Sequence, residues 1–426
     1  MSALPDRYIH LNANLLPGAI TEPETGKHPF IDIDDYVETA RLAESAGFDA
    51  VFLSDALAVQ PDPRNGWNVA LDPFTILGAL SRETTHIGLV ATASTTYSAP
   101  YALARAVLSI DHISNGRAGW NVITTMDPAA SRNFGVSAHP ARAERYRRAT
   151  EFTTVVRALW ASWPDDLSAH WDIDHLARRS IDHHGEFFDV AGPMQVPASR
   201  QGLPVLFQAG GSDDGIEVAA TFVDAVFSVG VDEAASRIYR TKLNTRSQQL
   251  RGTDVLVLPG LGVAIGSTDA EVERLLADAE AAVAMHDVER IADRYGLTPE
   301  RLTPFLDRPM PEGLLTLDPT ALGTSWQQSV GFAKGGIALA ARERNTLRRF
   351  IAVGGGLHRR LFGTPESNAD DLVGWVERGA ADGFNLHGFD LAPFVAEVVP
   401  LLRARGVLRT EYTASTLRDH LAQRVQ

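Results

Sequence analysis

The segment HIGLVATASTTYSAPYALARAVLSIDHISNGRAGWNVIT, residues 86–124, decides the fold class. It begins and ends with runs rich in β-branched residues, His86–Thr95 and Gly116–Thr124, and a longer helical pattern separates them. A strand, a helix and a second strand in this order are the unit of a parallel sheet covered by helices. The segment therefore predicts an α/β protein.

Runs of the same kind recur along the chain, and the helical patterns between them are amphipathic. We predict eight strands, at Tyr8–Leu16, Phe48–Asp55, His86–Thr95, Gly116–Thr124, Pro204–Gly210, Asp224–Val229, Val255–Gly266 and Phe384–Gly388. Eight strand–helix units are the number that closes a (β/α)8 barrel, so we expect a TIM barrel. The 426 residues exceed what a minimal barrel needs, which leaves room for insertions.

Two stretches do not fit a minimal barrel. Residues 164–203 follow the fourth strand and are rich in His, Asp and Pro, and we expect an excursion that carries a short hairpin. Residues 267–346 follow the seventh strand, and we expect them to form a lid over the barrel mouth, where functional lids usually lie. Residues 1–426 would then form a single barrel domain.

Local signals add detail to the second insertion and to the C-terminal region. Thr268 and Glu271 fit a capping box that opens a helix. We predict that this helix runs to about Tyr295, where Gly296 ends it. From Glu411 onward we expect a terminal helix.

Composition excludes several classes of function. The formal net charge of −14 argues against binding to nucleic acid or to an acidic membrane surface. The chain has no cysteine, which excludes disulfides, thiolate metal sites and a cysteine nucleophile. We find neither a signal-peptide pattern nor an apolar run long enough to span a bilayer, and we expect a cytoplasmic protein.

The segment Ser114–Thr125 carries the clearest functional signal. It reads as a strand that ends in Trp120, Asn121, Thr124 and Thr125. Polar residues at the carboxyl end of a barrel strand point into the active-site mouth. A turn position for Asn121 is the alternative that this segment leaves open.

Several motifs together resemble one family. They are GRAGWNVITT (116–125), SRNFG (131–135), HPARAERYRRATEF (139–152), PVLFQAG (204–210) and FGTPESNADDLVGWVERGAADGFNL (362–386). The chain resembles the FMN-dependent monooxygenases related to nitrilotriacetate monooxygenase component A, a branch of the bacterial luciferase-like superfamily. The resemblance extends over nearly the whole chain in the same order.

The resemblance implies a two-component monooxygenase. Such an enzyme binds reduced FMN (FMNH2) without a covalent bond and uses it with O2 to oxygenate a small organic substrate. The chain shows no Gly-rich dinucleotide motif between a strand and a helix, so a separate NAD(P)H:flavin reductase would supply the FMNH2. A homodimer or homotetramer is the assembly that the resemblance implies.

The resemblance also implies which residues bind FMN. Carried over position by position, these are Asp55, Thr92, Asn121, Tyr146, Gly211 and Ser212. The helix that begins after Ser212 offers free N–H groups to the phosphate, and Gly211 lets the backbone approach closely. Asn121 carries both donors and acceptors, as the edge of the flavin ring does. A structural helix cap at Ser212 and a core position for Tyr146 are the alternatives.

Two departures from the family pattern affect these assignments. Arg142 stands where relatives usually have a histidine, and His139 lies three residues before it, so both are candidates for a catalytic role. Asp213 and Asp214 follow Ser212 where relatives often have uncharged residues. Two carboxylates repel a phosphate, so either this phosphate site is altered or the two side chains point to solvent.

Other functions remain open. Four histidines, His170, His175, His183 and His184, fall in the first excursion, but no metal-ligand spacing accompanies them, and we expect no metal site. An oxidoreductase of the same superfamily that uses the deazaflavin F420 is one alternative. A flavin-binding barrel without catalytic activity is another. The polar residues at several strand ends favour an enzyme.

Overall fold

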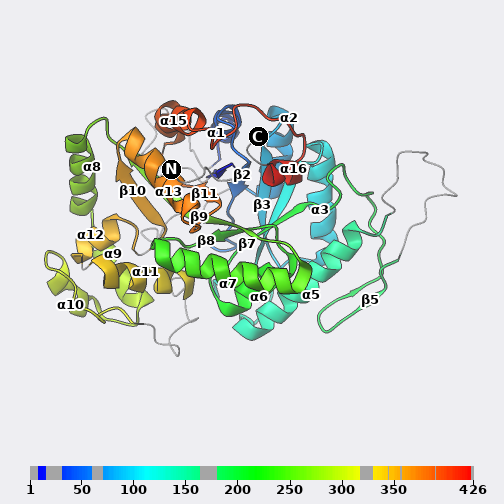
Figure 1. Ribbon diagram of the computed structural model, residues 1–426. Coiled ribbons are helices and arrows are strands. Elements are labelled where there is room, and N and C mark those ends of the chain that lie inside the picture. Colours follow the sequence, from blue (N-terminus) through cyan, green and yellow to red (C-terminus); the bar gives the residue numbers. More distant parts are fainter. Residues whose placement is uncertain are drawn as a thin grey trace.

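A closed barrel of eight parallel strands organises the molecule (Figure 1). The computed structural model describes residues 8–15, 31–59, 71–163, 180–316, 330–343, 345–355, 357–388 and 390–423. The barrel strands are β1 (His10–Asn14), β2 (Ala50–Leu53), β3 (Gly88–Ser94), β4 (Ala118–Ile123), β7 (Val205–Ala209), β8 (Ala225–Ser228), β9 (Leu256–Ile265) and β11 (Gly383–Leu386). The barrel closes where β1 pairs with β11 and β8 pairs with β9. All eight predicted strands are present, and the TIM-barrel prediction is confirmed.

Helices cover the outside of the barrel. Those that follow barrel strands or flank the barrel are α1 (Ile33–Ser45), α2 (Pro73–Glu83), α3 (Pro100–Ile113), α4 (Ala130–Asn133), α5 (Arg142–Trp160), α6 (Asp213–Phe222), α7 (Glu233–Arg251) and α13 (Pro365–Glu377). Several begin at a residue whose side chain accepts a hydrogen bond from the first turn, namely Asp32, Asp72, Ser212, Asp232 and Thr364. The chain ends with α14 (Leu391–Pro393), a π-helical turn (Phe394–Val398), α15 (Val399–Ala404) and α16 (Leu417–Ala422).

The two insertions lie on opposite sides of the barrel in Figure 1. The first contains the predicted short hairpin, in which β5 (His183–His184) pairs antiparallel with β6 (Asp189–Val190). His183 Nε2 lies 3.0 Å from Glu151 Oε1 of α5, and His184 Nδ1 lies 3.0 Å from Asp189 Oδ1. His170 and His175 lie outside the described residues.

The second insertion has its own small apolar core. Its helices are α8 (Asp269–Ala281), α9 (Met285–Arg294), α10 (Pro299–Leu302) with a 3-10 turn (Thr303–Phe305), α11 (Val330–Glu343) and α12 (Leu347–Ala352). Val288, Ile291, Leu302, Leu347 and Phe350 are buried together in this core. A Cβ at Gly211, in the loop after β7, would lie 2.8 Å from Gly331 Cα, so α11 packs against the carboxyl ends of the strands.

Two features of this region differ from the predictions. The single helix expected from Thr268 to Tyr295 is wrong, because the structure has two helices that break between Ala281 and Met285. The side chain of Asp287 accepts a hydrogen bond from Ala284 N (3.1 Å) and so starts α9 afresh. An unpredicted ninth strand, β10 (Arg359–Gly363), pairs with the last half of β9.

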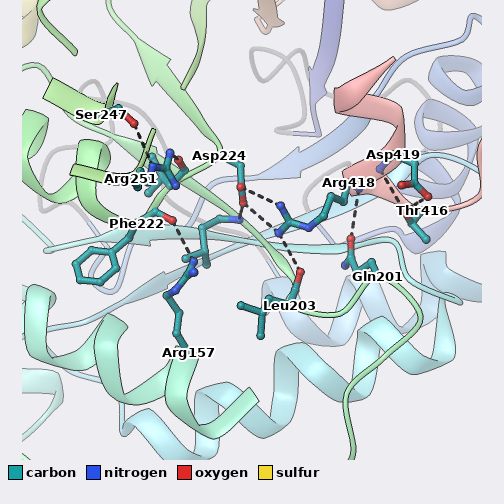
Figure 2. Close-up of polar contacts among 12 residues, drawn as sticks. Arg157, Gln201, Leu203, Phe222, Asp224, Ser247, Arg251, Thr416, Arg418 and Asp419 are labelled. Atoms are coloured by element: carbon teal, nitrogen blue, oxygen red, sulfur yellow. Dashed lines mark hydrogen bonds and ion pairs between the residues drawn. The ribbon is translucent and has the colours of Figure 1, made fainter. Parts of the chain in front are cut away.

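Carboxylates connect neighbouring barrel strands at their amino ends. Asp49, Asp224 and Asp382 each stand directly before a strand, and each accepts a hydrogen bond of 2.9 Å from a backbone N–H of the neighbouring strand. Each also faces an arginine, and these arginines are Arg409, Arg418 and Arg240, respectively. Figure 2 shows Arg418 reaching from α16 to Asp224 and to the carbonyl of Leu203.

Helix α16 closes the same end of the barrel. Leu417 belongs to the apolar cluster inside the barrel, together with Val90 and Phe207. A Cβ at Gly88 would lie 2.4 Å from the Leu417 side chain, and one at Gly119 would lie 3.3 Å from it. Glycine at these two strand positions therefore makes room for the helix. The expected terminal helix is present, and it seals the amino end of the barrel.

Candidate active site

The inner face of the barrel has an aromatic centre. The rings of Phe52 on β2 and Phe227 on β8 lie 4.4 Å apart between centroids, and Phe207 on β7 stacks on Phe227 at 5.0 Å. Because β2 and β8 are not neighbours in the sheet, the first contact crosses the interior. The polar side chains on the inner face therefore border a packed, dry centre.

Thr92 and Asn121 are neighbours on the inner face. Their strands are in register at this point, and Asn121 Nδ2 donates to Thr92 Oγ1 at 2.9 Å. Both side chains are buried, so the turn position for Asn121 is excluded. Asn121 Oδ1 is buried and has no hydrogen-bond partner among the described residues. Such an atom accepts an N–H from a ligand without losing a bond within the protein.

The amino end of α6 forms a second polar region. Ser212 caps this ten-residue helix by accepting a hydrogen bond from Gly215 N at 3.1 Å. Tyr146 Oη on α5 lies 3.2 Å from Ser212 Oγ, and Gly211 stands directly before the cap. The free N–H groups and partial positive charge of this helix end suit a phosphate. The cap and the ligand interpretations of Ser212 are therefore compatible.

The two aspartates at this helix end point outward. Asp213 is 76% exposed and lies 2.6 Å from Lys242 Nζ, and this hydrogen-bonded ion pair lowers the pKa of Asp213. Asp214 is 53% exposed, and its Oδ2 lies 3.1 Å from Arg142. Of the two sequence-based alternatives, the structure favours side chains that face solvent with their charges paired.

The structure separates the two catalytic candidates. Arg142 pairs with Asp214 and lies 5.7 Å above the ring of Tyr146, so it belongs to the region around the α6 end. His139 Nδ1 lies 2.8 Å from Tyr97 Oη instead, and its Nε2 is buried without a partner among the described residues. Burial, helped by the charge of Arg145, lowers the pKa of His139, which favours a neutral imidazole.

Asp55 lies two residues beyond the end of β2 and is half-buried. Burial and the negative charge of Asp72 raise the pKa of Asp55, against a hydrogen bond from Ala56 N–H that lowers it. The position at a strand end agrees with the prediction. Among the contacts that the structure records for the described residues, none joins Asp55 to Thr92 or Asn121 directly.

Sequence reasoning missed a third polar region, at β9, β10 and β11. His358 stands directly before β10, His387 follows β11 directly, and their ring centroids lie 4.5 Å apart. Asn385 is buried on β11, with its Oδ1 unpartnered among the described residues. The available signals were the glycines before His358 and a polar Asn within the apolar run of the last strand.

A parallel barrel that carries buried polar side chains near the carboxyl ends of its strands is the architecture of a TIM-barrel enzyme. A family model described as luciferase-like monooxygenase matches residues 13–382, and the chain belongs to this family. Within the described residues, no helix has the length and apolar character needed to cross a bilayer.

Individual relatives agree with the family assignment. Nitrilotriacetate monooxygenase component A from Aminobacter aminovorans is 38% identical, over 94% of this chain and 92% of the relative. The structure of EDTA monooxygenase from Chelativorans sp. BNC1 has a TM-score of 0.81 and 33% identity, and covers 98% of both chains. A riboflavin lyase, solved with modified FMN and riboflavin, has a TM-score of 0.77 and 27% identity, over 98% of this chain and 96% of the lyase. The expected family and the monooxygenase class of enzyme are confirmed.

Proposed function

We propose that this monooxygenase is the oxygenating component of a two-component system, which takes FMNH2 from a separate NAD(P)H:flavin reductase and uses it with O2. When bound, the reduced flavin supplies the electrons that activate O2, so that one oxygen atom goes to a small organic substrate and the other to water. The observation that carries the proposal is the Oδ1 of Asn121 beside Thr92, which is buried and has no partner in the described part of the chain. Its surroundings match a flavin edge that has N–H donors.

Two polar regions bind FMN, one its phosphate and the other its flavin ring. At the amino end of α6, Gly211, Ser212 and Tyr146 bind the phosphate through backbone N–H groups and two hydroxyls. Arg142 adds a positive charge beside this site. On the inner face of the barrel, Asn121 and Thr92 orient the flavin ring, and Asp55 accepts a hydrogen bond from the cofactor.

We assign anion binding, proton transfer and the exclusion of water to the remaining candidate residues. The guanidinium of Arg142 serves as an anion-binding group. We assign proton transfer beside the flavin to His139, whose neutral ring is hydrogen-bonded to Tyr97 at one nitrogen. The insertion at residues 267–346 acts as the lid that excludes water, and the contact between Gly331 and Gly211 supports this role.

We extend the proposal to location and assembly. The reductase needs NAD(P)H and must release FMNH2 close to this protein, which favours a cytoplasmic location. A homodimer or homotetramer is the proposed assembly. The substrate does not follow from relatives whose names refer to different molecules, such as nitrilotriacetate and EDTA.

Two measurements test the function. The purified protein with FMN, NADH and O2 is expected to leave NADH unoxidised until a flavin reductase is added. Rapid oxidation without a reductase would overturn the two-component assignment. Anaerobic titration is expected to show saturable binding of FMNH2 and much weaker binding of reduced F420. The reverse preference would favour the F420 alternative, which the match to a monooxygenase family already disfavours.

A further inference from the structure

Two histidines meet at the barrel mouth, and the proposed flavin site uses neither. The imidazoles of His358 and His387 contact each other at 67°, with a centroid distance of 4.5 Å. A Cβ at Gly260 on β9 would lie 2.3 Å from His358 Nδ1, so the ring covers the inner face of this strand. His387 follows Asn385 by two residues and shares its inward direction, because side chains alternate along a strand.

Each of these rings has a nitrogen that the protein leaves unused. His358 Nδ1 and His387 Nε2 are shielded from solvent and have no hydrogen-bond partner among the described residues. The same holds for Asn385 Oδ1 and for both side-chain atoms of Asn12, which is its register neighbour on β1. Several unpaired polar atoms gathered at one place are unfavourable unless a ligand or ordered water completes them.

A buried arginine lies close to the pair. Arg294 of α9 is 2% exposed and lies 5.4 Å from the ring of Phe332, which packs against His358 at 4.9 Å. Burial, the neighbouring His387 and the charge of Arg294 lower the pKa of His358. Burial lowers the pKa of His387 to about 4. Arg290 and Asp293 are the other charged groups beside Arg294. Both rings are therefore neutral at pH 7, and an anion would be needed to charge them.

We propose that His358 and His387 form a substrate subsite for a carboxylate, which takes hydrogen bonds from both imidazoles and makes them gain a proton when it binds. Asn385 and Asn12 hold the neighbouring polar part of the same substrate. The subsite lies at β9, β11 and β1, whereas the proposed flavin residues belong to β3 and β4, to the segments after β2 and β7, and to α5 and the amino end of α6. This inference rests on the proposed function, because it takes the mouth to be the place where substrate meets flavin.

The test follows the histidine signals by NMR, using protein labelled with ¹³C at histidine. Succinate serves as the anionic probe, and its diamide, succinamide, is the neutral match. Succinate is expected to raise the pKa of His387 from about 4 to about 7, and to raise that of His358 as well. A rise of about three units corresponds to roughly thousandfold tighter succinate binding when the ring is protonated, and to about tenfold tighter binding at pH 6. Succinamide is expected to leave both values unchanged.

Variants separate a ligand role from a structural one. His387→Gln keeps a hydrogen-bond donor but cannot be protonated, and it is expected to weaken succinate binding at pH 6 at least tenfold. His358→Gln gives a second, independent test if the first variant fails to fold. His184→Gln, in the exposed hairpin, is the matched control and is expected to change nothing.

The outcomes distinguish this inference from the proposed function. Absence of a pKa change with succinate up to 50 mM (roughly a hundredfold excess), or equal effects of succinate and succinamide, would overturn the carboxylate subsite. FMNH2 affinity is measured on the same samples. If FMNH2 binds and succinate does not act on the histidines, the subsite alone fails. If FMNH2 does not bind to the unaltered protein, the proposed function fails.

Discussion

At the amino ends of the barrel strands, carboxylates face guanidinium groups, whereas at the mouth the buried amides and imidazoles have no ion-pair partner among the described residues. Asp49 shows the first arrangement, since it binds Arg409 and the backbone N–H of Leu11. Asn121 and His387 show the second, each with one unused polar atom. The difference indicates that one end holds the barrel together and that the other is kept ready for ligands.

Two aspartates at the amino end of the barrel differ in pKa because their electrostatic surroundings differ. Burial alone would raise the pKa of Asp49, but Arg409 and His10 outweigh it and lower this pKa to about 2. Asp111 has hydrogen bonds from Ser199, Gln201 and Ala118 N but no arginine partner among the described residues, and burial raises its pKa to about 6. A guanidinium, more than the number of hydrogen bonds, decides whether a carboxylate here is stable in its charged form.

The largest effect on stability is expected from a substitution at the amino end of the barrel. Asp49→Ala leaves the Arg409 charge buried without its partner, and we expect a loss of about 3–5 kcal/mol in the free energy of unfolding. Urea denaturation measures it. Asp55→Ala is the matched control at the mouth, and we expect it to change stability by less than about 0.5 kcal/mol. Equal losses in the two variants would contradict the division between the two ends.

The second prediction concerns Asp111 and pH. Because its folded pKa is raised above the usual value, its contribution to stability is complete below about pH 4 and is lost as pH rises through 6. Asp111→Asn imitates the protonated form, so it is expected to stabilise the protein by roughly 2–3 kcal/mol at pH 8 and by little at pH 4. For Asp49 the sign is opposite, with stability lost as pH falls from about 4 to 2. A gain that does not change with pH would show that Asp111 is already neutral at pH 8.

The third prediction belongs to the mouth. Asn121→Ala removes a partner for the flavin edge and is expected to weaken FMNH2 binding by about 1–3 kcal/mol, with little change in the unfolding midpoint. Anaerobic titration and urea denaturation measure the two quantities. Asn244→Ala, which removes an acceptor for Val255 N on the outside of the barrel, is expected to do the reverse. Unchanged affinity in Asn121→Ala would remove this residue from the site.

The smallest effect is expected at the acidic turn. Asp213→Asn removes a charge that is exposed and paired with Lys242, so the ratio of FMN to riboflavin affinity is expected to move by less than about 0.5 kcal/mol. A clear rise in this ratio would show that the carboxylate acts on the phosphate despite its outward direction. Asp214→Asn tests the same point beside Arg142.

Much of the fold could be predicted because most barrel strands lie in short runs rich in β-branched residues, and amphipathic helices separate these runs. The break between α8 and α9 could not, since Ala281, Ala282 and Ala284 favour helix and the new start depends on the Asp287 cap and on the second core. Strand β10 was missed because Arg359 and Arg360 made its start look polar, although Arg359 in fact pairs with Asp371.

The candidate site also contains residues that could be predicted from the sequence and residues that could not. Asn121 and Tyr146 could be named because they lie in motifs of contiguous sequence, and Thr92 and Ser212 because they lie on a predicted strand or just after one. The structure pairs Asn121 with Thr92 and Tyr146 with Ser212. His358 and His387 are separated in the chain by two strands and a helix, and they meet because β10 and β11 both pair with β9. Long-range pairing of this kind leaves no periodic signal in the sequence.

The seal formed by α16 has a consequence for biosynthesis. Arg409, Arg418 and Leu417 leave the ribosome long after Asp49, Asp224 and Gly88, with which they complete contacts. Until then the nascent barrel keeps an open apolar end and unpaired carboxylates. A chain that lacks this short segment would therefore keep the barrel open at one end and would be prone to aggregation and proteolysis.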